Sequence, residues 1–315
     1  MKNKVLKEIY EEIKKSKRVL ILSHQNPDGD AISSQLALSL VIKRMGILVD
    51  ILAVDIPNNL KIIPGIENIK MNTNENYDLI ILVDVSLKNR LGVFEYLYDS
   101  SKKIIVIDHH ELKVDDGILH YINPSLASAT IALYEFFIAN NIEVDKTLAT
   151  YLYIGILTDT GGFANKNTNT KTFEVATALL STGINHHELY TEYARPEYDM
   201  AYLMLEKEVI NNLEIIDNKI AFSFLSKEIC EKYHYDTPKK FVNVGKNIKD
   251  VEVSVILIEE SETYRVSIRS KSSIDAAQVA QAFKGGGHKY ASGFRIKGEY
   301  DTIKKSIIEE IKNNY

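Results

Sequence analysis

A single cysteine, Cys230, is present in the 315 residues, and it lies far from every motif discussed below. The sequence therefore excludes an intrachain disulfide and any zinc site built from several cysteines. It also lacks an apolar run that approaches the ~18 residues of a membrane-spanning helix. The N-terminal residues 1–15 alternate charged and apolar side chains at helical spacing, unlike a signal peptide. These absences favour a reducing compartment, and we expect a cytoplasmic protein without a membrane partner.

An excess of positive charge is also missing. The chain has 38 Lys and Arg residues against 43 Asp and Glu residues, a formal net charge of −5. This balance argues against binding a long nucleic acid or a duplex through many phosphate contacts. The same charge balance is compatible with a small anionic substrate that is held by a few local cations. The length exceeds the ~100–200 residues of one domain and predicts two, and no internal repeat or low-complexity run is present.

The first half of the chain alternates strand and helix patterns. Short β-branched apolar runs predict strands that are buried on both faces of a parallel sheet, at residues 18–24, 48–54, 78–85 and 103–110, with a weaker one at 119–124. Helical spacing of apolar residues appears between and after them, at residues 31–46, 128–141 and 145–160. We therefore expect an α/β domain over residues 1–188, with a mostly parallel sheet flanked by helices.

The second half has a different pattern. Residues 189–212 form a charged helical stretch, which we interpret as a linker. Two hairpin patterns follow at residues 213–226 and 251–270, and then a helix at 274–283 and a final amphipathic helix. This order predicts a smaller α+β domain with a mixed sheet over residues 213–315.

Acidic and imidazole side chains follow three of the four strong strands of the first half. They are His24, Asp28 and Asp30 after the first, Asp84 after the third, and Asp108, His109 and His110 at the end of the fourth. In an open α/β sheet, ligands bind in the crevice beyond the carboxyl ends of the strands. All of these side chains can therefore converge on one site.

Each residue alone has a simpler explanation: Asp30 could cap the following helix, and a lone histidine is more often structural. Together, however, several carboxylates at one sheet edge would repel each other and raise their pKa values. Asp159, at the C-terminal end of a predicted helix, adds a carboxylate where the helix dipole is already negative, although it could be a surface residue of a glycine turn. A bound divalent cation removes these conflicts, and Asp oxygen with His nitrogen suits Mn²⁺-like ions.

Three consecutive glycines, Gly285, Gly286 and Gly287, precede His288 in the second half. Their backbone N–H groups are free of side chains and could hold a phosphate or the edge of a base. A helix cap with a surface histidine explains one glycine, but not three. Arg265, on the preceding strand, has the simpler interpretation of a solvated strand residue.

The ordered segments "SHQNPDGDA", "LVDVS", "DHH" and "GILTDTGGF" resemble the four motifs of the DHH-family phosphoesterases. The segment "GGGHKYASGF" resembles the hallmark of the C-terminal domain associated with that family. Size and domain content most resemble the branch of nanoRNases and pAp phosphatases. The resemblance implies a hydrolase that cuts very short oligonucleotides to mononucleotides, as an exoribonuclease, and dephosphorylates 3′-phosphoadenosine 5′-phosphate (pAp) to AMP.

The resemblance also implies two divalent ions, with Mn²⁺ favoured by the histidines and Mg²⁺ or Co²⁺ left open. It assigns His24 and Asp28 to one ion, Asp84 to both, and three residues to the second, namely Asp30, His109 and Asp159. Asp108 would orient an imidazole, and His110 would face the scissile phosphate. Two ions can activate water and stabilise both oxygens of an in-line displacement, so direct hydrolysis without a covalent intermediate is expected.

In the second domain, the resemblance places Arg269 and Ser270 at the terminal phosphate, beside the glycines and His288. The chain departs from the expected pattern at Ala164 and Asn165, where a basic or aromatic residue is common, and this puts a substrate contact in doubt. Of the other histidines, His186 and His187 follow Asn185 at a predicted helix start, and His120 and His234 have no acidic neighbours in a suitable pattern. We assign no functional role to these four residues.

Several alternatives stay open at this stage. A cyclic di-AMP or linear dinucleotide phosphodiesterase shares the core and the glycine segment, whereas an inorganic pyrophosphatase would lack that segment. A long single-strand exonuclease would need further basic or OB-type domains. A non-catalytic nucleotide sensor would not need every candidate ligand. The expected partners are short single-stranded RNA or DNA and small nucleotides, and the oligomeric state, including a homodimer, is left open.

Overall fold

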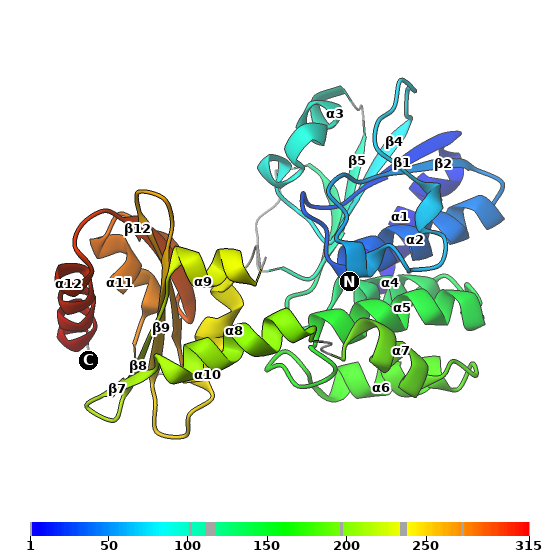
Figure 1. Ribbon diagram of the computed structural model, residues 1–315. Coiled ribbons are helices and arrows are strands. Elements are labelled where there is room, and N and C mark those ends of the chain that lie inside the picture. Colours follow the sequence, from blue (N-terminus) through cyan, green and yellow to red (C-terminus); the bar gives the residue numbers. More distant parts are fainter. Residues whose placement is uncertain are drawn as a thin grey trace. The chain divides into compact units, whose positions relative to one another are not determined.

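The computed structural model describes residues 2–100, 103–110, 117–195, 198–233, 238–271 and 274–314. The chain divides after Arg195 into two compact units. Figure 1 shows a sheet with helices in each of them. Within the described ranges, no helix combines the length and the apolar character that crossing a membrane would require.

The first unit contains a parallel sheet, as predicted, and this sheet has six strands. Its strands are β1 (Arg18–Leu22), β2 (Leu48–Leu52), β3 (Ile69–Lys70), β4 (Leu79–Val83), β5 (Ile104–Asp108) and β6 (Leu119–Ile122). Their order is β3-β2-β1-β4-β5-β6, and every neighbouring pair is parallel. The chain moves outward from β1 to β3 and then returns to place β4 on the other side of β1. The carboxyl ends of β1 and β4 therefore flank the switch point where α/β sheets bind ligands.

Both faces of this sheet are buried, because alternate strand residues point to opposite sides. Val19 and Ile21 face a core built with helices of one layer, whereas Leu20 and Leu22 face a smaller core on the other side. The larger layer contains α1 (Lys2–Lys15), α2 (Gly29–Arg44), α4 (Ala129–Ala139), α5 (Lys146–Asp159), α6 (Thr170–Leu180) and α7 (His186–Tyr193). The smaller core includes Leu97 of α3 (Glu95–Ser100) and Phe94 of the short η4 segment (Gly92–Phe94), and η3 (Lys88–Arg90) precedes them in the chain. Figure 1 shows α3 on the other side of the sheet from α2 and α5.

Two glycines allow α2 and α5 to pack closely against each other. A Cβ atom on Gly29 would overlap the side chain of Thr158, and a Cβ atom on Gly155 would overlap Thr130 and Asp30. This close approach places the N-terminal turn of α2 beside the last turns of α5. Acidic side chains from the two helices can therefore share one site.

The second unit contains a mixed sheet, as predicted, and this sheet also has six strands. Its strands are β7 (Glu214–Ile216), β8 (Ile220–Leu225), β9 (Val253–Glu259), β10 (Tyr264–Ser270), β11 (Gly286–His288) and β12 (Ala291–Ile296), in the order β11-β12-β10-β9-β8-β7. The β8–β9 pair is parallel, and the other pairs are antiparallel. Its helices are α8 (Met200–Asn211), α9 (Lys227–Lys232), α10 (Val242–Lys246), α11 (Ala276–Ala282) and α12 (Tyr300–Asn313).

Each face of the second sheet has its own apolar core. On one face, α11 and α12 pack on the sheet, with α12 burying Ile303, Ile307 and Ile311. On the other face, Leu205 and Val209 of α8 pack against strand residues. The stretch 189–212 is thus divided between the units: α7 packs in the first and α8 in the second.

Candidate metal centre

The loop after β1 delivers its side chains by starting α2 at once. Asp28 caps this helix, because its Oδ1 accepts hydrogen bonds from the backbone N–H groups of Asp30 (3.0 Å) and Ala31 (3.1 Å). The cap is therefore Asp28, not Asp30 as the sequence allowed. Because Asp28 uses Oδ1 for the cap, its Oδ2 is available toward the imidazole of His24, 3.9 Å away. Asp30 lies in the first turn and is fully buried.

Asp84 follows β4 directly, and its backbone N–H donates to the carbonyl of Ile107 on β5. Its φ of +57° lies in the left-handed region, which is unfavourable for most non-glycine residues. Strain of this kind persists where the surrounding structure over-determines it. The side chain is 3% exposed, so it enters the interior of the site.

Asp159 is the last residue of α5, and two amide side chains bind its carbonyl oxygen. Asn165 Nδ2 donates to it at 3.1 Å and Asn167 Nδ2 at 3.2 Å, and Asn167 also donates to Ala127 O. Asn165, which departs from the expected pattern, thus holds the helix end that carries Asp159. Neither asparagine was identified from the sequence as a partner of Asp159, because six and eight residues separate them from it.

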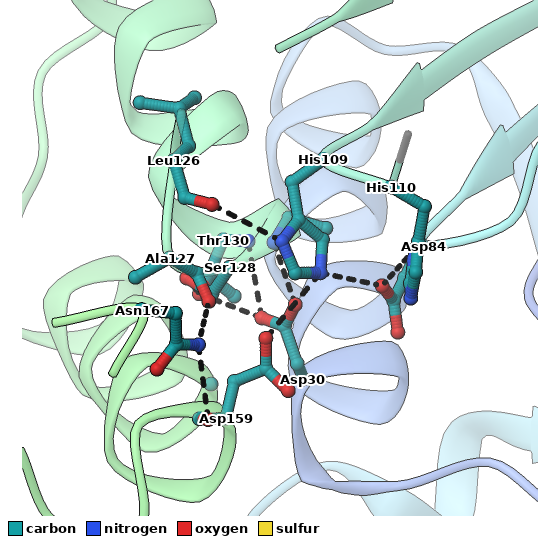
Figure 2. Close-up of polar contacts among 12 residues, drawn as sticks. Asp30, Asp84, His109, His110, Leu126, Ala127, Ser128, Thr130, Asp159 and Asn167 are labelled. Atoms are coloured by element: carbon teal, nitrogen blue, oxygen red, sulfur yellow. Dashed lines mark hydrogen bonds and ion pairs between the residues drawn. The ribbon is translucent and has the colours of Figure 1, made fainter. Parts of the chain in front are cut away.

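These side chains converge, and Figure 2 shows His109 between the carboxylates of Asp84 and Asp159. Nε2 of His109 lies 3.4 Å from Oδ1 of Asp84 and 3.3 Å from Oδ2 of Asp159. On the other side of the site, Nε2 of His24 lies 3.4 Å from Oδ2 of Asp84. The two oxygens of Asp84 therefore face two different histidines.

Three groups of potential ligands result from this arrangement, and two of them match the ligand sets that the resemblance implied. The first contains His24, Asp28 and Asp84, and the second contains Asp30, His109 and Asp159, with the ligand atoms of each group within 4.8 Å of one another. The third consists of Asp84, Asp108, His109 and His110. The structure thus brings together all six residues that the sequence suggested as ligands. Asp84 belongs to the first group and contacts His109 of the second.

Both histidines are held with Nε2 toward the carboxylates. Nδ1 of His24 lies 2.8 Å from Gln25 O, and Nδ1 of His109 lies 3.2 Å from Leu126 O. A carbonyl can only accept, so each Nδ1 carries the proton and donates it. In the neutral ring, Nε2 then has a free lone pair that points into the site, the arrangement of most metal-bound histidines.

Asp30 is bound by the N-terminus of α4 as well. Its Oδ2 accepts from the backbone N–H of Ala129 at 2.6 Å, and its Oδ1 accepts from Thr130 N at 3.1 Å and Thr130 Oγ1 at 2.7 Å. Figure 2 shows these contacts beside His109. They hold the carboxylate at the start of a helix, where the dipole favours negative charge. The sequence analysis missed Thr130, which is 100 residues away in the chain.

Burial and charge shift the pKa values of the whole cluster. Burial raises the pKa of Asp159 to about 6, and burial together with Asp84 and Asp159 raises that of Asp30. Burial opposes protonation of His24 and His109, but the contacts with Asp84 raise their pKa values to about 9 and about 10. Burial also opposes ionisation of Asp84, yet the two imidazoles lower its pKa to about 2. Without bound cations, protons on the two histidines therefore compensate part of the negative charge of the carboxylates. Bound divalent cations would take over this role.

Asp108 and His110 form a pair beside the cluster. Oδ1 of Asp108 accepts from the backbone N–H groups of His109 and His110 and from His110 Nδ1 at 2.8 Å. The imidazole that Asp108 orients is thus His110, while His109 is oriented by a carbonyl. The hydrogen bond with Asp108 raises the pKa of His110, whose side chain is 37% exposed. This histidine can present a cation at the edge of the cluster.

The residues fit a pair of divalent cations. The donors are carboxylate oxygens and imidazole Nε2 atoms, which hard and borderline divalent ions accept. Asp84 Oδ1 is buried and receives no well-formed hydrogen bond from the described residues. A cation beside this oxygen would satisfy it and offset the repulsion from Asp84 that, in addition to burial, raises the pKa of Asp30.

The candidate substrate residues of the second unit have different environments. Arg269 and Gly286 line a groove, but Ser270 points to the opposite face, where its buried hydroxyl donates to Ile274 O. A Cβ atom on Gly285 would lie 2.5 Å from Gly293 O, so Gly285 serves close packing. Gly287 has a φ of +144° within β11. The side chain of His288 lies outside the described part of the chain.

Fold and site together define an α/β protein with a candidate two-metal centre at the switch point of its parallel sheet. Residues 18–156 match the family model described as the DHH family, N-terminal domain, and residues 217–313 match the DHHA1 domain. The chain therefore contains a DHH N-terminal domain followed by a DHHA1 domain.

Relatives and solved structures with similar sequences extend over the whole chain. A Streptococcus mutans protein named probable bifunctional oligoribonuclease and PAP phosphatase NrnA is 29% identical, with 98% of each chain covered. The Thermus thermophilus bifunctional oligoribonuclease and PAP phosphatase NrnA is 29% identical, with 93% of this chain and 90% of that one covered. The crystal structure of an exopolyphosphatase-related protein from Bacteroides fragilis has a TM-score of 0.86 at 26% identity, with 98% of this chain and 96% of that one covered.

Proposed function

We propose that the protein is a metal-dependent phosphoesterase that hydrolyses very short oligonucleotides to mononucleotides and dephosphorylates pAp to AMP. The observation that carries this proposal is the pair of ligand groups that Asp84 connects through His24 and His109. The names of the relatives, bifunctional oligoribonucleases and PAP phosphatases, support the choice of substrates. Mn²⁺ is the proposed ion, because imidazole is present in both groups.

Two divalent cations, when bound, would lower the pKa of a water and offset charge on the phosphate oxygens. His24, Asp28 and Asp84 would hold one of them, and Asp84, Asp30, His109 and Asp159 the other. Asp84 and the α4 N-terminus keep the ligands in place before substrate arrives, so little reorganisation is needed.

His110 is the candidate group of the chain for the substrate itself. Asp108 holds its Nδ1 and favours the imidazolium, so Nε2 of this partly exposed side chain can donate to a phosphate oxygen of the transition state. The contribution of His110 is electrostatic. The proposed mechanism does not require a cysteine or serine nucleophile. We infer direct hydrolysis by water, with short single-stranded oligonucleotides and small nucleotides as ligands.

Turnover of a four-substrate panel with Mn²⁺ tests the proposal: pAp, a ribo-dinucleotide, cyclic di-AMP and pyrophosphate. We expect hydrolysis of pAp and the dinucleotide, and none with the Asp84→Ala variant. Hydrolysis of cyclic di-AMP alone would support a cyclic dinucleotide phosphodiesterase. Nucleotide binding without any turnover or bound Mn²⁺ would support a sensor.

A further inference from the structure

A groove of about 480 Å³ lies open on one face of the second sheet, over β10, β12 and β11. It is on the same face as α8, because Ser267 and Arg265 pair with Ile256 and Ile258, which pack in the α8 core. The groove therefore lies on the face that α8 covers elsewhere, over strands β10, β12 and β11, and no residue of α8 lines it.

The floor of the groove is almost free of side chains. One rung across the three strands consists of Ser267, Gly293 and Gly286, which pair in register. A Cβ atom on Gly286 would meet nothing within 4 Å. A strand surface without side chains is where another backbone or a ligand can approach closely.

Arginines border this floor on the two adjacent rungs. Arg269 lies on one side, and Arg265, paired with Arg295 of β12, lies on the other. Arg265 and Arg269 share a face because strand residues alternate, and four residues of strand separate them by ~13 Å. This distance leaves room for an extended chain between the two guanidinium groups.

The three arginines differ in their partners. Among the described residues, no carboxylate forms an ion pair with Arg265 or Arg269, and Arg269 donates only to the adjacent carbonyl, Ile268 O. Burial lowers the pKa of Arg269, so the uncompensated charge is disfavoured there. In contrast, Arg295 is held by Glu260 through two hydrogen bonds, 2.7 and 3.0 Å long. Arg295, and to a smaller extent Arg265, lower the pKa of Glu260, but only Arg295 forms an ion pair with it among the described residues. Arg265 and Arg269 therefore remain available for an anion, whereas Arg295 is neutralised.

We propose that Arg265 and Arg269 bind successive phosphates of a single-stranded oligonucleotide along this groove, and that Glu260 limits the accepted length by neutralising Arg295 at the far end. The inference deepens the proposed function and rests on it. Guanidinium groups favour phosphate because they donate two parallel hydrogen bonds to it. A carboxylate at the end of the positive track repels the next phosphate, so additional nucleotides gain little. Arg265, which the sequence analysis interpreted as a solvated residue, becomes a specificity determinant.

The test compares Arg265→Gln and Glu260→Gln with matched controls. Lys297 and Glu262 form an exposed ion pair of 2.9 Å just beyond β12 and do not line the groove, so Lys297→Gln and Glu262→Gln remove the same charges nearby. The substrates are pAp and oligoadenylates of two to six nucleotides. Thermal melting checks that each variant is folded.

For Arg265→Gln, we expect the ratio of kcat/KM on the five-nucleotide substrate to that on pAp to fall about tenfold, through KM, as for one lost charge-assisted hydrogen bond. The slope of log KM against log salt for this substrate should fall by about 0.7. Glu260→Gln should raise the ratio, because it releases Arg295. Both control variants should leave the ratio and the slope unchanged.

If Arg265→Gln leaves the ratio and the salt slope unchanged, the inference is overturned while the proposed function stands. An equal change in the Lys297→Gln control would overturn the inference as well. If the wild-type chain hydrolyses neither substrate, the proposed function fails. Fluorescence anisotropy of a labelled five-nucleotide oligoadenylate then decides the inference: equal affinity for wild type and Arg265→Gln would overturn it, and about tenfold weaker binding by the variant would support it.

Discussion

The hydroxyl of Thr130 donates a hydrogen bond of 2.7 Å to Oδ1 of Asp30, across 100 residues of sequence. Gly155 makes room for this contact, because any Cβ atom there would overlap both side chains. Three helices, α2, α4 and α5, therefore meet at one buried carboxylate. The contact decides which way Asp30 points into the ligand cluster.

Replacing Thr130 by valine should weaken metal binding about tenfold, because outer contacts of this kind typically contribute 10- to 100-fold to affinity. Valine keeps the volume of the side chain but cannot donate to Asp30. Isothermal titration with Mn²⁺ measures the affinity, and Thr130→Ser, which retains the hydroxyl, should restore it. Equal Mn²⁺ affinity in the valine variant and wild type would contradict this role for the hydroxyl.

Asp84→Ala should abolish turnover and lower the bound metal. Asp84 faces both His24 and His109, so its loss affects both ligand groups, and we expect an effect larger than about 100-fold on kcat/KM. Metal content by mass spectrometry and steady-state kinetics with pAp provide the readouts. Asp99→Ala, which removes an exposed carboxylate paired with Lys88, is the control and should behave like wild type.

His110→Gln should lower kcat by about 100-fold, comparable to removal of one transition-state donor, with Mn²⁺ affinity close to wild type. Asp108 raises the pKa of His110, so the active imidazolium is lost only as the pH rises. The wild-type rate should thus fall on the alkaline side, and the variant should lack this fall. A pH series of kcat tests both points, and a large loss of Mn²⁺ affinity would instead place His110 among the ligands.

The metal-free chain should lose stability as the pH rises above 6.5. The pKa values of His24 and His109 are raised to about 9 and about 10, so the folded state retains protons that the unfolded state has lost. The contribution of the two histidines to the free energy of unfolding is fully present below pH 6.5 and is lost as the pH rises through 9 to 10. Asp159, with a pKa of about 6, is already ionised over most of this pH range.

Urea unfolding in EDTA at pH 6.5, 8 and 9.5 measures this dependence, and His24→Gln should flatten it. Mn²⁺ affinity should change with the opposite sign and rise with pH, since the ion competes with the same protons. Metal-free stability that is constant or rising over the window would show that the histidines are not protonated in the fold.

Gly285→Ala and Gly286→Ala should differ, although the two residues are adjacent. A Cβ atom on Gly285 would lie 2.5 Å from both Gly293 O and Phe294 Cβ, and such overpacking typically costs about 1–3 kcal/mol. A Cβ atom on Gly286 has open space, so Gly286→Ala should change the free energy of unfolding by less than about 0.5 kcal/mol. Urea denaturation compares the two, and a similar loss in both would indicate a shared backbone role.

The hydrophobic pattern of the sequence was sufficient to predict most strands of the first unit. Residues 19–22 and 79–83 are continuous apolar runs, and their burial on both faces of the sheet follows from the pattern. Strands β3, β11 and β12 and helices α3, α6, α9 and α10 were not predicted. Most of these segments are short, and β12 begins next to a glycine-rich segment, so their structure depends on the neighbours that they contact.

The sequence alone determined which residues could form the site, because parallel strands deliver their carboxyl ends to one edge and metal-binding side chains follow those ends. Only the tertiary structure decided how they are oriented. Thr130 and Leu126 reach Asp30 and His109 through the packing of α4, and Ser270 turns from the groove because alternate strand residues face opposite ways. The pairing of Arg295 with Glu260, and the lack of such a partner for Arg265 among the described residues, depends on strand register. Sequence spacing specifies the composition of a site, whereas contacts between distant segments set its geometry and charge.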